Sequence, residues 1–256
     1  MGADRFAGRR RQIRREQGVK RLRIVVALTA VSLLAVTTIG VLNSELTDVD
    51  RISVIGNSRT ATDDVVASTG ISVGNPLLDL DLATAKRQVE ALPWIAEVEV
   101  RRRLDGEVVV RVIEREAVVA LPAGSGLVLV DQTGYQLEPV AVQPDGFIPV
   151  AGIEASGQPG EYAPQETVLV LNALQGLTPG LRLEVDRFRV EDGALVIELT
   201  GGGQAVLGDS SQLGEKIQAL ETLLARVDLQ CVSIIDLRVP SAATVRRSES
   251  AEGACI

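Results

Sequence analysis

The strongest pattern in the sequence is an apolar run, Ile24–Leu42, that contains no charged residue. A helix needs about 20 apolar residues to cross the hydrocarbon core of a bilayer, so the run predicts a membrane-spanning helix over residues 24–43. Its many Ile, Leu and Val side chains favour insertion more than its scattered Ser and Thr oppose it. A cleaved secretory signal is the alternative, but the run exceeds the usual signal core and no A-x-A site follows Leu42. We therefore expect a retained anchor.

The charges beside this run predict its orientation. Residues 1–23 form a basic arm in which Arg and Lys far outnumber Asp4 and Glu16. A short basic flank stays in the cytoplasm, so we expect a cytoplasmic N-terminus and an extracytoplasmic C-terminal part, as in a single-pass type II protein of the plasma membrane. The arm is also suited to contact anionic lipid of the inner membrane or, less well, cytosolic nucleic acid.

Strand and helix patterns alternate between residues 48 and 116. Residues 49–55 alternate apolar and polar side chains and end at a turn-forming Gly-Asn pair, which predicts a strand. Two helical patterns follow, at residues 60–70 and from Leu82 to Leu92. Two further strands flank Asp105–Gly106, which is a strong hairpin signal. The predicted order is β-α-α-β-β.

Two features of this region allow competing interpretations. Trp94 either fills the core, which is the simpler interpretation for its large apolar ring, or lies on a surface. Arg101–Arg103 either face a partner or form a solvated edge. Alternate residues of a strand point to opposite faces, so we favour the solvated edge.

Residues 117–246 predict a second domain with a mixed β-sheet and packed helices. Its expected strands are residues 117–121, 127–131, 135–139, 182–190, 194–199, 204–208 and 232–240, and its expected helices are residues 165–177 and 211–227. Pro179–Gly180 is expected to end the first helix, and Asp209 and Ser210 to cap the second. Residues 247–256 predict a disordered tail. The fold class is therefore α+β.

Composition excludes several functions. The net charge is −8 and basic residues gather in the arm, so the C-terminal part is a poor ligand for nucleic acid. The absence of His removes Ser-His-Asp and Cys-His catalysis and argues against a zinc enzyme, and we expect no metal and no cofactor. Cys231 and Cys255 would pair in an oxidising exterior or stay apart if the tail is disordered. The excess of Arg over Lys indicates high-GC coding.

A membrane-anchored extracytoplasmic enzyme is the alternative class of function. Carboxylate pairs such as Glu114 with Glu116, or Glu184 with Asp186, have the residue types of acid–base catalysis. Carboxylates two positions apart on a strand usually mark its solvated face, however. Asp236 differs because it lies in an apolar strand, where an ion pair with Arg238 competes with a functional role.

Short motifs in both domains resemble those of the FtsQ/DivIB family of cell division proteins. The first domain carries VIGN at 54–57, GNPLLDLD at 74–81, LPWI at 92–95 and IERE at 113–116; the second carries LVLVDQTG at 127–134, VLG at 206–208 with Lys216 after it, and IIDLRVP at 234–240. One position departs from the family pattern. Family members usually carry an Arg-x-x-Pro turn at residues 101–104, and here Leu104 takes the place of the proline. The resemblance covers the anchor and both domains in order, but not the tail after Arg247.

This resemblance implies a POTRA domain at residues 48–116, a β domain at 117–246 and no enzymatic activity. It implies a divisome scaffold at the division septum, with FtsB/FtsL-like bitopic proteins and the septal peptidoglycan synthase machinery as partners. In the family, the segment after the IDLR-like strand carries the FtsB contact. The corresponding residues here are Val239, Pro240, Ser241, Ala242, Ala243, Thr244 and Val245. Since Pro240 lacks an N–H, we expect this segment at a sheet edge, where it either binds a partner strand or only completes the fold.

Overall fold

The computed structural model describes residues 23, 25–36, 48–226 and 232–247. The predicted anchor falls only partly within these ranges, where residues 25–36 are helical and exposed. Across the described ranges, no helix combines the length and the apolar character that crossing a membrane requires. Residues 1–22 of the basic arm, both cysteines and residues 248–256 lie outside the described residues.

The chain divides into two compact units. The first comprises Met1–Ile55, Thr62–Arg87 and Glu99–Arg111, and the second comprises Gly56–Ala61, Gln88–Val98 and Val112–Ile256. Each unit is therefore assembled from segments that are separated in the sequence.

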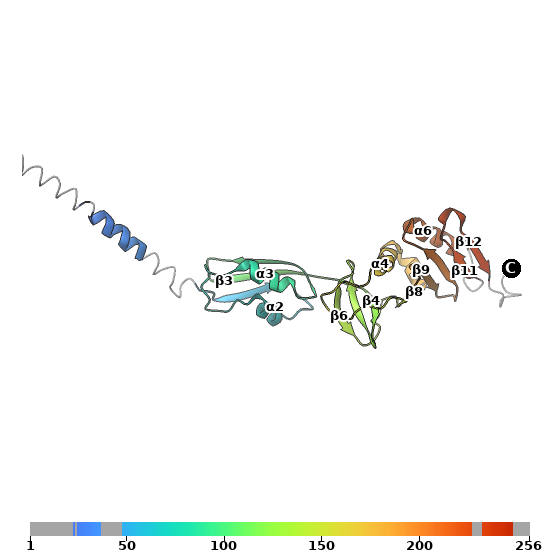
Figure 1. The fold of residues 1–256 in the computed structure, drawn as a ribbon, viewed down its shortest axis with the longest axis horizontal. Helices are drawn as coiled ribbons and strands as arrows, with labels where there is room; N and C mark the ends of the chain where they lie inside the picture. The colour runs from blue at the N-terminus through green and yellow to red at the C-terminus, as the bar shows by residue number, and fades with distance from the viewer. Residues whose placement is uncertain (1–22, 24, 37–47, 227–231, 248–256) are drawn as a thin grey trace, which may run out of the picture. The chain divides into compact units, whose positions relative to one another are not determined.

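The N-terminal sheet has the predicted β-α-α-β-β order. Its elements are β1 (Arg51–Ile55), α2 (Thr62–Thr69), α3 (Leu82–Glu90), β2 (Ile95–Arg102) and β3 (Glu107–Glu114). The strand order is β1-β3-β2, and β1 runs parallel to β3 with Arg51 opposite Glu107. Figure 1 labels β3 and the two helices. Since β2 and β3 are joined by a short turn, the parallel β1–β3 pair is the long-range contact that closes the sheet.

Local sequence explains both helices. Helix α2 carries Asp63 and Asp64 in its first turn, where carboxylates favour the positive end of the helix dipole. Gly70 follows with φ of +66°, a conformation that suits glycine. Before α3, the Asp81 carboxylate accepts hydrogen bonds from the Thr84 N–H (3.0 Å) and hydroxyl (2.6 Å), as an N-cap does.

The second unit contains a three-stranded antiparallel sheet. It is formed by β4 (Ala117–Ala123), β5 (Gly126–Asp131) and β6 (Gln136–Val140), in the order β4-β5-β6. The expected strands at 127–131 and 135–139 correspond to β5 and β6, which are joined by a turn in which the Gly134 N–H donates to the Asp131 carbonyl at 3.0 Å. Apolar residues of β4 and β5 alternate between two clusters, so this sheet is packed on both faces.

The unit continues into a six-stranded mixed sheet with helices. Its elements are β7 (Val150–Ala151), α4 (Thr167–Gly176), α5 (Pro179–Leu183), β8 (Val185–Glu191), β9 (Ala194–Leu199), β10 (Gln204–Gly208), α6 (Leu213–Leu224), β11 (Val232–Asp236), the 3₁₀ turn η3 (Pro240–Ala242) and β12 (Thr244–Arg247). The strand order is β12-β11-β10-β9-β8-β7. Phe188, Leu195, Ile197 and Leu207 are fully buried in its core. Arg247, assigned to the tail from the sequence, is the last residue of β12.

Two helix predictions require correction. Pro179–Gly180 follows the end of α4 but also begins α5, because Pro is tolerated at the first helical position and the Thr178 hydroxyl accepts the Leu181 N–H at 3.3 Å. The expected strand at 182–190 accordingly begins only at Val185. Helix α6 begins at Leu213, after Gln212 in the left-handed region (φ +51°), and neither Asp209 nor Ser210 caps it.

The prediction that Trp94 fills the core is wrong. Trp94 is half-buried and packs against a small cluster of Ala120, Leu129 and Leu137. Its Nε1–H donates to the Glu138 carboxylate at 2.9 Å, so the polar end of the ring has a partner outside the core. By contrast, Arg101–Arg103 are all exposed, and β2 is an edge strand of its sheet, as predicted from the sequence.

Candidate partner-binding site

The predicted partner segment lies at the end of the six-stranded sheet. Strand β12 is the terminal strand of this sheet and lies beside β11 (Figure 1). All four of its residues are exposed. Of the seven predicted residues, only Thr244 and Val245 belong to β12; Pro240–Ala242 form η3, and Ala243 links the two. Val239 and Val245 are exposed apolar side chains. The segment thus offers a short strand edge next to a turn, and not one continuous strand.

An ion pair between Asp236 and Arg238 lies at the end of β11, directly before this segment in the chain. The Arg238 Nε donates to Asp236 Oδ1 at 3.0 Å, and the Arg238 N–H donates to the same oxygen at 3.1 Å. Arg238 lowers the pKa of Asp236 and Asp236 raises the pKa of Arg238, mainly through their side-chain hydrogen bonds. Asp236 is half-buried and forms the ion pair with Arg238, which was one of the two roles that the sequence offered for it.

A buried lysine organises the neighbouring turn before α6. Lys216 is only 1% exposed, and its ammonium donates to the backbone carbonyl and the Oδ1 of Asp209, both at 3.0 Å. The hydrogen bonds from Ser211 and Lys216 lower the pKa of Asp209 to about 2. The sequence carried a signal for this pair, because Lys216 falls on the apolar stripe of Leu213, Ile217 and Leu220, where an unpaired charge is costly.

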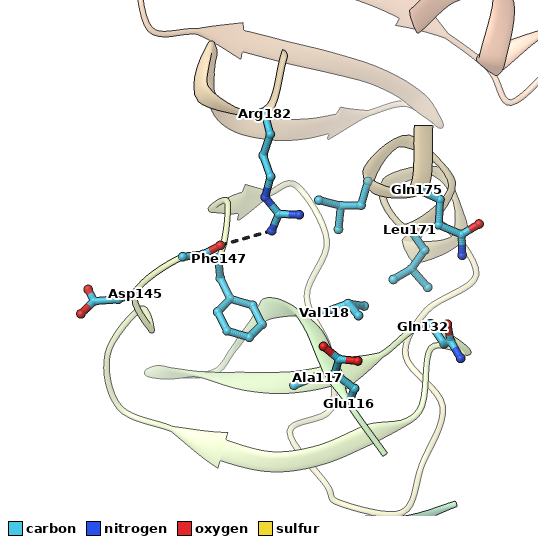
Figure 2. A pocket seen from close by; sticks show the side chains of 11 residues that line it. Glu116, Ala117, Val118, Gln132, Asp145, Phe147, Leu171, Gln175 and Arg182 are labelled. Carbon is cyan, nitrogen blue, oxygen red and sulfur yellow. Dashed lines mark hydrogen bonds between the residues drawn. The ribbon is translucent and has the colours of Figure 1, made fainter. Parts of the chain in front are cut away.

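The second unit also holds an open pocket of about 330 Å³. Its floor is apolar: Leu171 of α4 and Val118 of β4 lie across it from Phe147, as Figure 2 shows. Arg182 reaches over it and donates to the Gly146 carbonyl at 3.2 Å. The remaining lining combines the apolar Ala117 and Leu174 with polar and acidic side chains, which are those of Glu116, Gln132, Asp145 and Gln175. This arrangement has no convergent set of donors or acceptors that would select a small ligand.

Glu114, one of the candidate catalytic carboxylates, has a structural role. It accepts hydrogen bonds from the N–H and hydroxyl of Ser58 (3.0 and 2.6 Å) and from the N–H groups of Arg59 and Thr60 (3.0 and 2.8 Å). Desolvation raises its pKa, but these hydrogen bonds outweigh that effect and lower the pKa of Glu114 to about 2. The loop that they hold places the Arg59 guanidinium 4.6 Å from the centre of the Trp94 ring.

A second ion pair follows directly in the chain. Arg115 donates to the nearly buried Asp131 carboxylate at 2.7 Å and to the Ile95 carbonyl at 3.2 Å, and its guanidinium lies 4.3 Å from the centre of the Tyr135 ring. Desolvation raises the pKa of Asp131, whereas hydrogen bonds from Thr133, Tyr135 and Arg115 lower it, with a net lowering. No sequence pattern indicated this pair, because its members belong to separate predicted elements.

The other candidate carboxylates are exposed or hydrogen-bonded within the chain. Glu116 and Asp186 are exposed, and Glu184 accepts a hydrogen bond from the Thr200 hydroxyl at 3.1 Å. A carboxyl group that acts as a general acid near neutral pH needs a raised pKa, whereas the pKa of Glu114 is lowered. In the described part of the chain, no group of three or more Asp, Glu, His or Cys is arranged to hold a metal ion.

Comparison with known proteins agrees with this architecture. The profile described as "POTRA domain, FtsQ-type" matches residues 47–115, and that described as "Cell division protein FtsQ/DivIB, C-terminal" matches residues 117–238. Together they cover both domains in the expected order. The chain belongs to the FtsQ/DivIB family of cell division proteins.

Proteins named "Cell division protein FtsQ" from several bacteria are similar to this FtsQ/DivIB chain. That of Corynebacterium glutamicum is 26% identical over 77% of this chain and 86% of its own length. That of Caulobacter vibrioides is 25% identical over 79% of this chain and 68% of its own length. That of Cereibacter sphaeroides is 30% identical over 52% of this chain and 42% of its own length. The C-terminal profile stops at residue 238, immediately before the candidate partner segment.

Proposed function

We propose that this chain is a membrane-anchored scaffold of the division machinery that acts without catalysis. It links FtsB/FtsL-like bitopic proteins and the septal peptidoglycan synthase machinery at the division septum. Membership of a cell division family supports this role. The carboxylates of Glu114, Asp131 and Asp236 are each held in hydrogen bonds within the chain, which further favours a scaffold over an acid–base enzyme.

The scaffold is held by a single helix over residues 24–43, with the basic arm inside the cell and the POTRA domain (48–116) and β domain (117–246) outside. Charge asymmetry around Ile24–Leu42 supports this orientation. A reporter enzyme active only outside the cytoplasm, fused after Arg247, tests it. We expect activity from the fusion, and a membrane-bound but silent fusion would reverse the orientation.

The partner binds at residues 239–245 by adding a strand or an extended segment to β12. The observation that carries this proposal is that β12 is the last strand of its sheet and is wholly exposed. Such an edge offers backbone groups to an incoming chain, while Val239 and Val245 offer apolar contact. Strand addition therefore explains binding without a deep pocket.

Charge substitution on this edge tests the site. Ala242→Glu and Val245→Glu should each weaken capture of a co-expressed FtsB-like protein. Both side chains are exposed on the segment where the partner is proposed to bind, and each substitution adds bulk and charge there. Leu183→Glu is the matched control, since it places the same charge at another exposed apolar position. Ala243→Pro is a weaker test, because Ala243 has φ of −58°, which proline adopts readily. Undiminished capture by both edge variants would place the partner elsewhere.

A further inference from the structure

Two loops of the first unit meet where the described chain resumes at Asp48. The Val49 N–H donates to the Asn75 carbonyl at 2.9 Å, and the Gly74 N–H donates to the Val49 carbonyl at 2.8 Å. On the other side, the Asp50 N–H donates to the Gly106 carbonyl at 2.8 Å. The loop at 72–78 and the hairpin turn at 103–106 therefore flank the start of β1.

These two loops carry three exposed apolar side chains, which we call the apolar tip. They are Val73 (65% exposed), Leu78 (42%) and Leu104 (90%). The Arg102 guanidinium donates to the carbonyls of Leu77 and Leu78 at 3.2 and 2.9 Å, so the hairpin and the loop are joined. A single exposed Leu needs no explanation, but three apolar side chains on two linked loops mark a contact surface.

Chain length limits where this surface can lie, and this step rests on the proposed anchor. If residues 24–43 span the membrane, only residues 44–47 separate the span from Asp48. Consecutive Cα atoms are 3.8 Å apart, so Asp48 lies within about 20 Å of the membrane end of the helix. The loops that flank β1 are then held at high local concentration beside the bilayer, where even a weak affinity is effective.

We propose that Val73, Leu78 and Leu104 insert into the headgroup–acyl boundary of the outer leaflet and so hold the POTRA domain against the membrane. The charges near the apolar tip are mixed: Arg103 forms an ion pair with Asp105 at 3.3 Å, and Asp48 and Asp50 lie at the start of the chain segment that the two loops flank. Insertion of apolar side chains is therefore the main attraction, and a zwitterionic bilayer is sufficient.

Lipid-quenching of a fluorophore tests this proposal on the full chain. In a background with Cys231→Ser and Cys255→Ser, Leu104→Cys is labelled with an environment-sensitive fluorophore and the protein is reconstituted into phosphatidylcholine vesicles. We expect blue-shifted emission that falls severalfold when lipids spin-labelled near the headgroup are added. Leu183→Cys and Val142→Cys, which are exposed apolar positions outside the apolar tip, are the matched controls and should keep their emission.

A second variant tests whether Leu104 is needed for the apolar tip to contact lipid. Leu104→Asp should severalfold reduce the quenching of a label at Val73→Cys, whereas Leu183→Asp should leave it unchanged. Vesicle flotation tests the membrane anchor separately from the apolar tip. If the protein does not float with the vesicles, both the anchor and this inference are wrong. If the protein floats but the Leu104 label is not quenched, the inference alone is wrong. A blue shift without lipid quenching would indicate protein contact, and quenching that requires anionic lipid would indicate attraction by charge; both results would overturn the proposal.

Discussion

Glu114 should stabilise the region around Trp94 in a pH-dependent manner. In the folded chain, its carboxylate accepts hydrogen bonds from Ser58, Arg59 and Thr60, and Gln at this position would lose the charge and at least part of this set. The pKa is lowered from 4.5 to about 2, which corresponds to an upper limit of about 3 kcal/mol. The site is partly solvated, so we expect Glu114→Gln to cost about 1–2 kcal/mol at pH 7.

The pH dependence has a definite sign. Because the folded-state pKa of Glu114 lies below its unfolded value, the stabilisation is fully present above pH 4.5 and is lost as the pH falls through about 2. The difference between the wild-type chain and Glu114→Gln should therefore shrink between these two values, where the wild-type carboxylate becomes protonated.

Fluorescence of the single tryptophan provides a local readout during urea unfolding, because Trp94 packs beneath the Arg59 guanidinium that this loop positions. The assay uses residues 44–256 at a series of pH values. Glu97→Gln is the matched control, since Glu97 is exposed on β2 and loses the same charge. Equal unfolding midpoints for Glu114→Gln and wild type at pH 7, or a difference that persists below pH 2, would refute this reasoning.

Three further predictions test other parts of the chain. Arg115→Ala should cost about 2–3 kcal/mol in urea unfolding, because it removes a charged partner from the nearly buried Asp131; a loss no larger than that of Arg111→Ala would contradict this. Asp209→Ala should lower the Tm more than Lys216→Met, because the first variant leaves a buried ammonium without its carboxylate whereas the second removes the charge; the reverse order would contradict it. Limited proteolysis of residues 44–256 should cut first at 154–164 and after Arg247, and early cleavage at Arg115 would show a loose junction.

Where local pattern and tertiary contact agree, the sequence alone predicted the elements. The order β-α-α-β-β and the turn at Asp105–Gly106 follow from periodicity and turn chemistry. The expected strands at 182–190 and 194–199 likewise form a hairpin, in which Asp192 and Gly193 both have positive φ, as such two-residue turns require. These features depend on residues close in sequence, so local sequence is sufficient to predict them.

Long-range contacts decided the remaining features. The parallel pairs β1–β3 and β10–β11 join strands separated by helices, and no local pattern specifies which strands become neighbours. Asp209 resembles a helix cap in sequence, but its carboxylate accepts a hydrogen bond from Lys216. The ammonium of Lys216 is buried, and a buried charge is costly unless it is paired. Trp94 has the composition of a core residue, yet its partners Arg59 and Glu138 lie far along the chain and keep its ring only half-buried. The sequence by itself determined most of the elements and the exposed position of Arg101–Arg103, because these depend on residues close in sequence. The tertiary structure decided which strands become neighbours and which partners most of the charged side chains find, because those partners lie far apart in the chain.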